Sequence, residues 1–272
     1  MTTTKKSFKK NVGDKAKLTN SASPSGPTTD WIRVIEEGGG FPRVDLDTFR
    51  RLIEKTQNYR FFQVLRKHVK LDDAVLEAGC GWAVSSFALA REGIHVVALD
   101  ISDKLIQDLQ NIQNQWGEDA NNSLELLVGD LFKLDELGRQ FDCIFSDGTY
   151  QHFLHPEERK EILENLHRRL RHKGKLIVAV QNMKNPFFKI VVGSKMPPMQ
   201  TFGLKSLRQE LERGRFEVIE DGCAFVNAGF EQWLKARWLA WPVNAVNQIF
   251  ERLPRLAQSL FAAHIYCVAR KR

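Results

Sequence analysis

Short apolar runs alternate with helical patterns through the middle of the chain. The apolar runs end close to residues 76, 99, 128, 145 and 180, and the runs at 95–99, 124–128, 141–145 and 175–180 have the length of buried strands. Apolar residues recur at three- and four-residue steps over 84–91, 102–114 and 156–171, which predicts helices there. This alternation predicts an α/β fold with a parallel, doubly wound sheet, whose ligands bind at the carboxyl ends of the strands.

The segments on either side of this core predict additional elements. Apolar residues at helical spacing follow Asp47, a candidate N-cap, and continue to about His68, which predicts one long amphipathic helix before the first strand. With a short apolar segment at 31–35, this makes residues 29–71 a region of cap helices. Residues 182–203 carry no clear period, and a loop of this length usually has a function, so they are expected to form a lid. A helix at 206–213 and strands at 216–220 and 263–269 follow.

Residues 227–262 form an insertion between the last two expected strands. Its apolar residues recur at helical steps up to Pro242 and again up to Pro254, and three of the six tryptophans lie between Trp233 and Trp241. Two interpretations stay open. In one, two helices pack on the sheet edge or on a second copy of the chain in a homodimer. In the other, the insertion is a hydrophobic cap that admits an apolar acceptor or contacts an anionic membrane surface, with four basic residues facing the headgroups: Lys235, Arg237, Arg252 and Arg255.

A turn with two glycines follows the first buried strand. Residues 75–83 read Val-Leu-Glu-Ala-Gly-Cys-Gly-Trp-Ala, and a helix is expected directly after them. Strand, glycine turn and helix form the start of a nucleotide-binding βαβ unit. Glu77 places a carboxylate at the strand end, which repels a pyrophosphate and attracts an ammonium or sulfonium group. The turn therefore favours S-adenosylmethionine over a dinucleotide.

Acidic residues also follow the next two strands. Asp100 ends the run at 95–99, where a carboxylate can accept two hydrogen bonds from a ribose diol. Asp130 follows the run at 124–128 and can accept a hydrogen bond from the adenine amino group. Three strand-end acids in register indicate one ligand across the sheet edge. No cysteine, histidine or carboxylate spacing indicates a metal site.

Residues 72–179 resemble a class I S-adenosylmethionine-dependent methyltransferase. The first motif of that family appears as Glu77-Ala78-Gly79-Cys80-Gly81-Trp82-Ala83, with Ala83 in place of the third glycine. The resemblance implies a Rossmann-like, mostly parallel sheet of about seven strands with an antiparallel C-terminal hairpin edge, in a domain spanning 72–272. It also implies that the cofactor is held by Glu77, Ala78, Gly79, Cys80, Gly81, Asp100, Ile101, Asp130, Leu131, Ser146 and Asp147.

The segment after the fourth strand faces the methyl group in the resembled family. The family commonly has a Glu-His pair there, and this chain has Gln151 and His152. His152 is the candidate catalytic base because an ordinary imidazole titrates near neutrality, although a hydrogen-bonded histidine at a helix start is an equally good interpretation. Tyr150 is expected to position the acceptor. The motif Asn-Pro-Pro-Tyr of nucleic-acid amino methyltransferases is absent from this segment.

Charge is concentrated at the N-terminus. The net charge is +7, and residues 1–28 contribute +5 of it through six lysines and one aspartate, which is typical of a disordered basic tail. Nucleic acid is therefore an unlikely partner for the folded part. Four scattered cysteines and the lack of an 18-residue apolar stretch favour a cytoplasmic protein, at most peripheral to a membrane.

These features lead to one principal functional hypothesis and two alternatives. The first is an enzyme that transfers a methyl group from S-adenosylmethionine to O, N or C of a small, partly apolar acceptor. The second keeps this chemistry but makes a protein or an RNA the acceptor, which the basic tail would bind. The third is a non-catalytic protein that binds S-adenosylmethionine.

Overall fold

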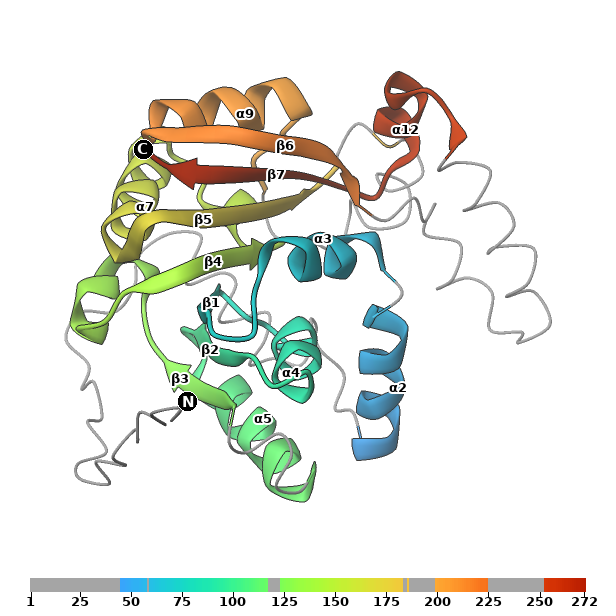
Figure 1. The fold of residues 1–272 in the computed structure, drawn as a ribbon, viewed down its shortest axis with the longest axis vertical. Helices are drawn as coiled ribbons and strands as arrows, with labels where there is room; N and C mark the ends of the chain where they lie inside the picture. The colour runs from blue at the N-terminus through green and yellow to red at the C-terminus, as the bar shows by residue number, and fades with distance from the viewer. Residues whose placement is uncertain (1–44, 58, 117–122, 183–184, 186–198, 225–251) are drawn as a thin grey trace, which may run out of the picture.

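A computed structural model describes residues 45–57, 59–116, 123–182, 185, 199–224 and 252–272 (Figure 1). The expected basic tail, the segment at 31–35, nearly all of the lid and most of the insertion lie outside these residues. The described part contains one seven-stranded sheet in the order β3-β2-β1-β4-β5-β7-β6, with helices on both faces. The predicted α/β fold is confirmed.

Five strands run parallel and carry the nucleotide-binding order. They are β1 (Ala74–Ala78), β2 (His95–Asp100), β3 (Leu124–Val128), β4 (Phe141–Asp147) and β5 (Leu170–Gln181). The chain crosses from β3 back to β4 beside β1, so the strand order reverses at β1 and β4, where ligands bind in such sheets. β6 (Phe216–Ala224) and β7 (His264–Lys271) complete the sheet, and β7 is antiparallel to both of its neighbours. This is the expected antiparallel edge.

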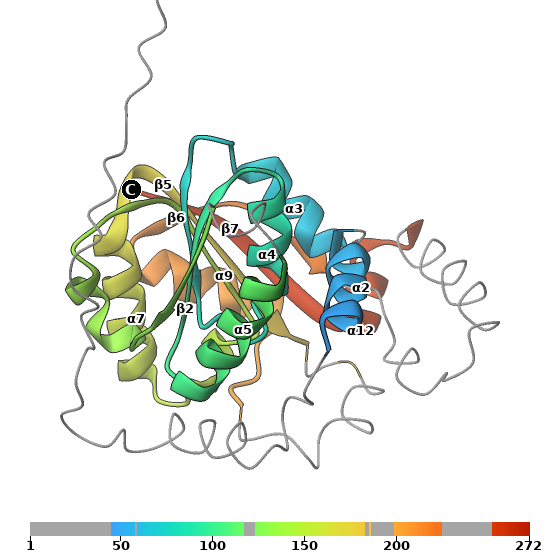
Figure 2. The ribbon, with the colours of Figure 1, turned by 90° about the horizontal axis from the view of Figure 1, so that it is seen from below.

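The helices cover the sheet in two layers (Figure 2). One face carries α2 (Leu46–Gln57), α3 (Arg60–His68), α4 (Val84–Arg91) and α5 (Asp103–Trp116). The other face carries α7 (Pro156–Arg169), α9 (Leu204–Arg213) and the 3-10 segment η1 (Leu131–Leu137). A second 3-10 turn, η2 (Tyr150–His152), follows β4, and α12 (Arg255–Phe261) precedes β7. None of the helices in the described part of the chain has both the length and the apolar character needed to span a bilayer.

The region before the first strand differs from the expectation of one long helix. α2 ends at Gln57 and α3 begins at Arg60, and Tyr59 takes an extended conformation (φ −78°, ψ 140°) as the N-cap of α3. The cap of α2 is Asp45 and not Asp47, because an Asp45 oxygen accepts a hydrogen bond from the Thr48 amide at 2.8 Å. The break turns α3 toward the strand ends, so that the cap region contributes to the site described below.

The helix after β4 also ends earlier than expected. α7 stops at Arg169, and β5 begins at the next residue, so Gly174 lies inside β5 and not at a helix end. A Cβ atom at Gly174 would lie 2.9 Å from the Arg171 carbonyl oxygen and 3.1 Å from that of Asp142. The glycine is therefore explained by close backbone packing beside β4.

Candidate active site

The glycine turn between β1 and α4 is held against β2. The Gly79 and Cys80 amides both donate to the Leu99 carbonyl oxygen at 2.9 Å. Gly79 and Gly81 have φ angles of +74° and +48°, in the left-handed region that glycine adopts without strain. A Cβ atom at Gly79 would lie 2.3 Å from Cγ2 of Thr149, whose hydroxyl donates to the Gly79 carbonyl oxygen at 2.8 Å. The turn is thus closed by β2 on one side and by the loop after β4 on the other.

Ala83 stands where the resembled family has its third glycine. It is the N-cap of α4, with φ +50° and ψ +26°, so it keeps the left-handed conformation of a glycine. The methyl group is fully buried in the core. A non-glycine residue in this conformation costs about 1 kcal/mol, so the substitution retains the path of the turn at a small cost in stability.

Asp100 connects the turn to the end of β2. One carboxylate oxygen accepts from the Gly81 amide at 2.9 Å, and the other accepts from the Ser102 amide at 3.1 Å. The side chain is buried, and desolvation raises its pKa, while these backbone donors act in the opposite direction. Because each carboxylate oxygen has two lone pairs, the group can still accept hydrogen bonds from a ligand diol.

Glu77, the residue before the last one of β1, is a buried carboxyl group. One of its oxygens accepts a hydrogen bond from the Ser86 hydroxyl of α4. Burial raises its pKa well above the usual range, and the negative charges of Asp147 and Asp100 act in the same direction. A cation placed beside Glu77 would therefore relieve an unfavourable concentration of acidic groups.

Asp147, at the end of β4, shares a cavity with Glu77. Burial raises the Asp147 pKa to about 7. Among the described residues, no partner accepts or donates a hydrogen bond at its buried Oδ1 atom. An uncompensated buried carboxylate is costly, so this oxygen is a candidate ligand contact. The cavity is lined by these acids, by the glycine turn and by four residues of the α2–α3 region, namely Thr56, Tyr59, Phe61 and Phe62.

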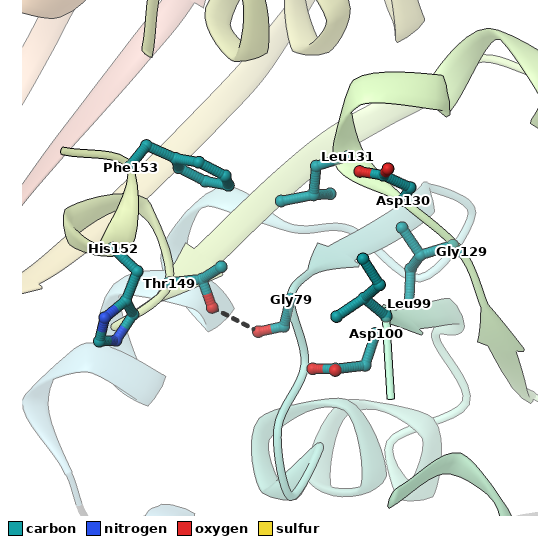
Figure 3. Close-up of a pocket in the computed structure, with 10 residues that line it drawn as sticks. Gly79, Leu99, Asp100, Gly129, Asp130, Leu131, Thr149, His152 and Phe153 are labelled. Carbon is teal, nitrogen blue, oxygen red and sulfur yellow. Dashed lines mark hydrogen bonds between the residues drawn. The ribbon is translucent and has the colours of Figure 1, made fainter. Parts of the chain in front are cut away.

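A second cavity lies next to the first, and Figure 3 shows the residues that line it. Its walls come from the ends of β1, β2 and β3 and from the loop after β4. The lining residues are Gly79, Leu99, Asp100, Ile101, Gly129, Asp130, Leu131, Thr149, His152 and Phe153. Gly79, Asp100 and Thr149 line both cavities, so the two adjoin at the glycine turn, and together they are called the cleft below. Asp130 accepts from the Phe132 amide at 2.9 Å, which fixes its carboxylate at the rim.

His152 lines this second cavity, on the side opposite Asp130 (Figure 3). Its imidazole is mostly buried, and desolvation lowers its pKa to about 4. The ring is therefore neutral at pH 7. Protonating a group with this pKa at pH 7 costs about 4 kcal/mol, so the structure makes His152 a weaker base than its sequence position indicates.

Three of the expected site residues lie away from both cavities. Tyr150 is buried in the core, where its hydroxyl donates to Glu210 at 3.1 Å and its ring packs on Phe202 at 5.8 Å. This corrects its assignment as an acceptor-positioning residue, because the side chain points to α9. Ser146 and Ala78 are buried inside β4 and β1 and line neither cavity.

The sequence interpretation missed several cleft residues. Thr149 and Phe153 follow β4, and Phe61, Phe62 and Trp82 supply an aromatic wall beside the glycine turn. Phe61 and Phe62 lie in α3, whose apolar residues follow the ordinary period of a packing helix, so no local signal separates their role in the cleft from a core role. In the described residues there is no cluster of three or more His, Cys, Asp or Glu side chains suited to a metal ion.

Residues 75–174 match the sequence family described as a methyltransferase domain. This segment, 100 of the 272 residues, is similar to the methyltransferase domains of that family. It runs from β1 into β5 and contains Glu77, Gly79, Asp100, Asp130 and Asp147. The strand-end acids therefore lie in the part of the chain that matches the family.

Solved structures share the methyltransferase fold. Magnesium protoporphyrin IX methyltransferase from Synechocystis PCC 6803, with bound S-adenosylhomocysteine, has 18% identity and a TM-score of 0.59, over 91% of this chain and 100% of that one. A mycolic acid cyclopropane synthase in complex with S-adenosylhomocysteine has 16% identity and a TM-score of 0.56, over 78% and 83% of the two chains. The cyclase SpnF has 16% identity and a TM-score of 0.55, over 78% and 80%. At these identities the likeness shows the fold alone, and the three proteins are named for different reactions.

Proposed function

We propose that the protein transfers a methyl group from S-adenosylmethionine to O, N or C of a small, partly apolar acceptor. The observation that carries the proposal is the cleft at the carboxyl ends of β1, β2, β3 and β4, which carries an acid near each strand end. A cationic nucleoside fits this charge pattern, whereas a pyrophosphate would be repelled by it. The cofactor's sulfonium supplies an activated methyl group.

We assign each chemical group of the cofactor to residues of the cleft with complementary charge or polarity. Glu77 and Asp147 would face the ammonium and sulfonium groups of its methionine part, and Asp100, where the two cavities adjoin, would accept hydrogen bonds from the ribose. The second cavity has apolar side chains from Leu99, Ile101 and Leu131, which suit an adenine ring, with Asp130 at the rim for its amino group. The methyl donor would then lie near Gly79 and Thr149, between the two cavities.

The aromatic wall supports an apolar acceptor of small size. Phe61 and Phe62 are buried residues that line the first cavity, and Trp82 lines it beside the glycine turn. Proteins with a similar fold include enzymes named for a porphyrin and for mycolic acid. Transfer in such a site depends mainly on holding donor and acceptor in line and on excluding water.

Calorimetry with S-adenosylhomocysteine tests the shared premise. The wild type is expected to bind, and Asp100→Asn is expected to weaken binding roughly tenfold, because an amide cannot replace both acceptor oxygens. Asp103→Asn, an exposed acid at the start of α5, is the matched control and should bind like the wild type. No binding by the wild type would exclude the cofactor assignment. With binding established, transfer of labelled methyl from S-adenosylmethionine to fractions of a metabolite extract identifies the acceptor, and no transfer to any fraction would favour a binding protein.

His152→Ala distinguishes a catalytic base from a cavity wall. We expect the dissociation constant of S-adenosylhomocysteine to rise about tenfold and the single-turnover rate to fall less than a hundredfold, because the imidazole lines the cleft and is a poor base at pH 7. His172→Ala, an exposed histidine in β5, is the control. Unchanged cofactor affinity with a rate loss of about two to four orders of magnitude would restore the base role.

A further inference from the structure

Helix α7 carries two buried polar side chains on the face that packs behind the cleft. The exposed fractions of Arg159 and Asn165 are 6% and 2%. Both lie within a helix whose other buried residues include Ile162, Leu163 and Leu166. A buried guanidinium or amide is costly unless its donors are used, so their partners show what these residues do.

Both side chains donate to backbone carbonyl groups of cleft loops. Arg159 Nη1 donates to the carbonyl oxygens of Phe153 and Leu154 at 2.9 and 2.7 Å. Asn165 Nδ2 donates to those of Leu131 and Phe132, both at 3.0 Å. One loop follows β4 and the other follows β3. A single helix therefore fixes the backbone of two loops that are about twenty residues apart along the chain.

The two loops form facing walls of the second cavity. Figure 3 shows Leu131 on one side and Phe153 on the other, and both line the cavity. The ring of Phe132, from the loop after β3, also packs edge to face on the ring of Phe153, with the ring centroids 5.6 Å apart. α7 holds the backbone carbonyl groups of both loops. The distance between the Leu131 wall and the Phe153 wall therefore depends on the positions of the Arg159 and Asn165 side-chain nitrogen atoms.

The guanidinium group of Arg159 forms an ion pair with Glu210 of α9. Its Nε atom donates to Glu210, which also accepts from the Tyr150 hydroxyl at 3.1 Å. The exposed fractions of the Arg159 and Glu210 side chains are 7% and 19%. A buried ion pair of this kind contributes little net stability compared with an apolar pair, so positioning is the better explanation for it.

We propose that Arg159 and Asn165 are positioning residues that set the width of the adenine-binding part of the cleft. The inference rests on the proposed function, which assigns adenine to the second cavity. It assigns to α7 a role in cofactor binding although neither side chain lines either cavity.

The test compares two ligands across matched variants. Arg159→Met and Asn165→Ala are measured by calorimetry with S-adenosylhomocysteine and with 5′-methylthioadenosine, which lacks the amino-acid end. Lys160→Met removes the same charge from the exposed face of α7 and is the control. We expect both test variants to lose about tenfold in affinity, and by the same factor for the two ligands, because only the adenine wall has moved. Glu77→Gln should instead lose affinity for S-adenosylhomocysteine alone.

The outcomes separate this inference from the proposed function. A wild type that binds neither ligand overturns the cofactor assignment itself. A wild type that binds both, together with test variants that bind both equally well, overturns only the role of α7. If Arg159→Met does not fold, Asn165→Ala decides, since it leaves the ion pair with Glu210 in place. A larger loss for S-adenosylhomocysteine than for 5′-methylthioadenosine would indicate general damage to the site and would also count against the inference.

Discussion

Gly79→Ala is expected to weaken binding of S-adenosylhomocysteine by roughly a hundredfold or more. The added Cβ atom would lie 2.3 Å from Cγ2 and 2.5 Å from Oγ1 of Thr149, and the backbone has a φ angle of +74°. Thr149 cannot move freely, because its hydroxyl donates to the Gly79 carbonyl oxygen. The turn must therefore shift at the point where the two cavities meet. Calorimetry at a temperature where the variant is folded measures the effect.

Gly138→Ala distinguishes the effect of the steric clash with Thr149 from the effect of backbone strain. Gly138 has a similar φ angle of +62°, but a Cβ atom there would have no heavy atom within 4 Å. This control should lose about 1 kcal/mol of unfolding free energy from the left-handed conformation alone and keep its cofactor affinity. If Gly79→Ala binds like Gly138→Ala, the close approach of Thr149 does not matter for the ligand.

The sequence was sufficient to predict those helices and strands that have a clear hydrophobic period and a clear end to their apolar run. The helix predicted at 84–91 has these bounds in the structure. Asp100 ends β2 and Asp130 follows β3 as expected, and Glu77 lies one residue before the end of β1. The reason is that parallel strands buried on both faces give continuous apolar runs, and the residue that ends a run marks the sheet edge. The break between α2 and α3 had no such signal, because the apolar spacing continues through residues 58 and 59.

The site was only partly predictable for a related reason. Asp147 was predicted only from the family resemblance. Glu77, Gly79, Asp100 and Asp130 were predicted because chemistry and position coincide at strand ends. Arg159 and Asn165 were not, because a polar residue in an amphipathic helix normally indicates the solvated face, and only the tertiary structure shows where their donors go. Tyr150 was assigned to the site because Thr149 and His152, close to it in sequence, line the cleft. Its own side chain instead lies in the core. The low pKa of His152 also depends on burial, which the sequence does not report.

Affinity for S-adenosylmethionine is expected to depend on pH through Asp147. Burial raises the pKa of this carboxyl group to about 7, and a cationic ligand binds its ionised form. Above pH 7 the carboxylate is present, and below pH 7 binding must first remove a proton. The affinity should therefore fall by up to about tenfold for each pH unit below 7. Glu77, whose pKa is also raised, acts in the same direction.

Asp147→Asn should reveal this carboxylate in both binding and stability. At pH 8 the variant is expected to bind S-adenosylmethionine up to about a hundredfold more weakly and to show a smaller slope between pH 6 and 8. Its unfolding free energy without ligand should rise. An acid whose folded-state pKa is raised destabilises the folded protein progressively as pH increases from its ordinary value of 3.8 to about 7, by up to about 4 kcal/mol. Denaturant unfolding at pH 5 and pH 8 measures this contribution of Asp147 to the unfolding free energy. Asp72→Asn, which changes an exposed acid before β1, is the control. Equal wild-type affinities at pH 6 and pH 8, with no stability gain in Asp147→Asn at pH 8, would show that this carboxylate is neither strained in the free protein nor in contact with the cofactor.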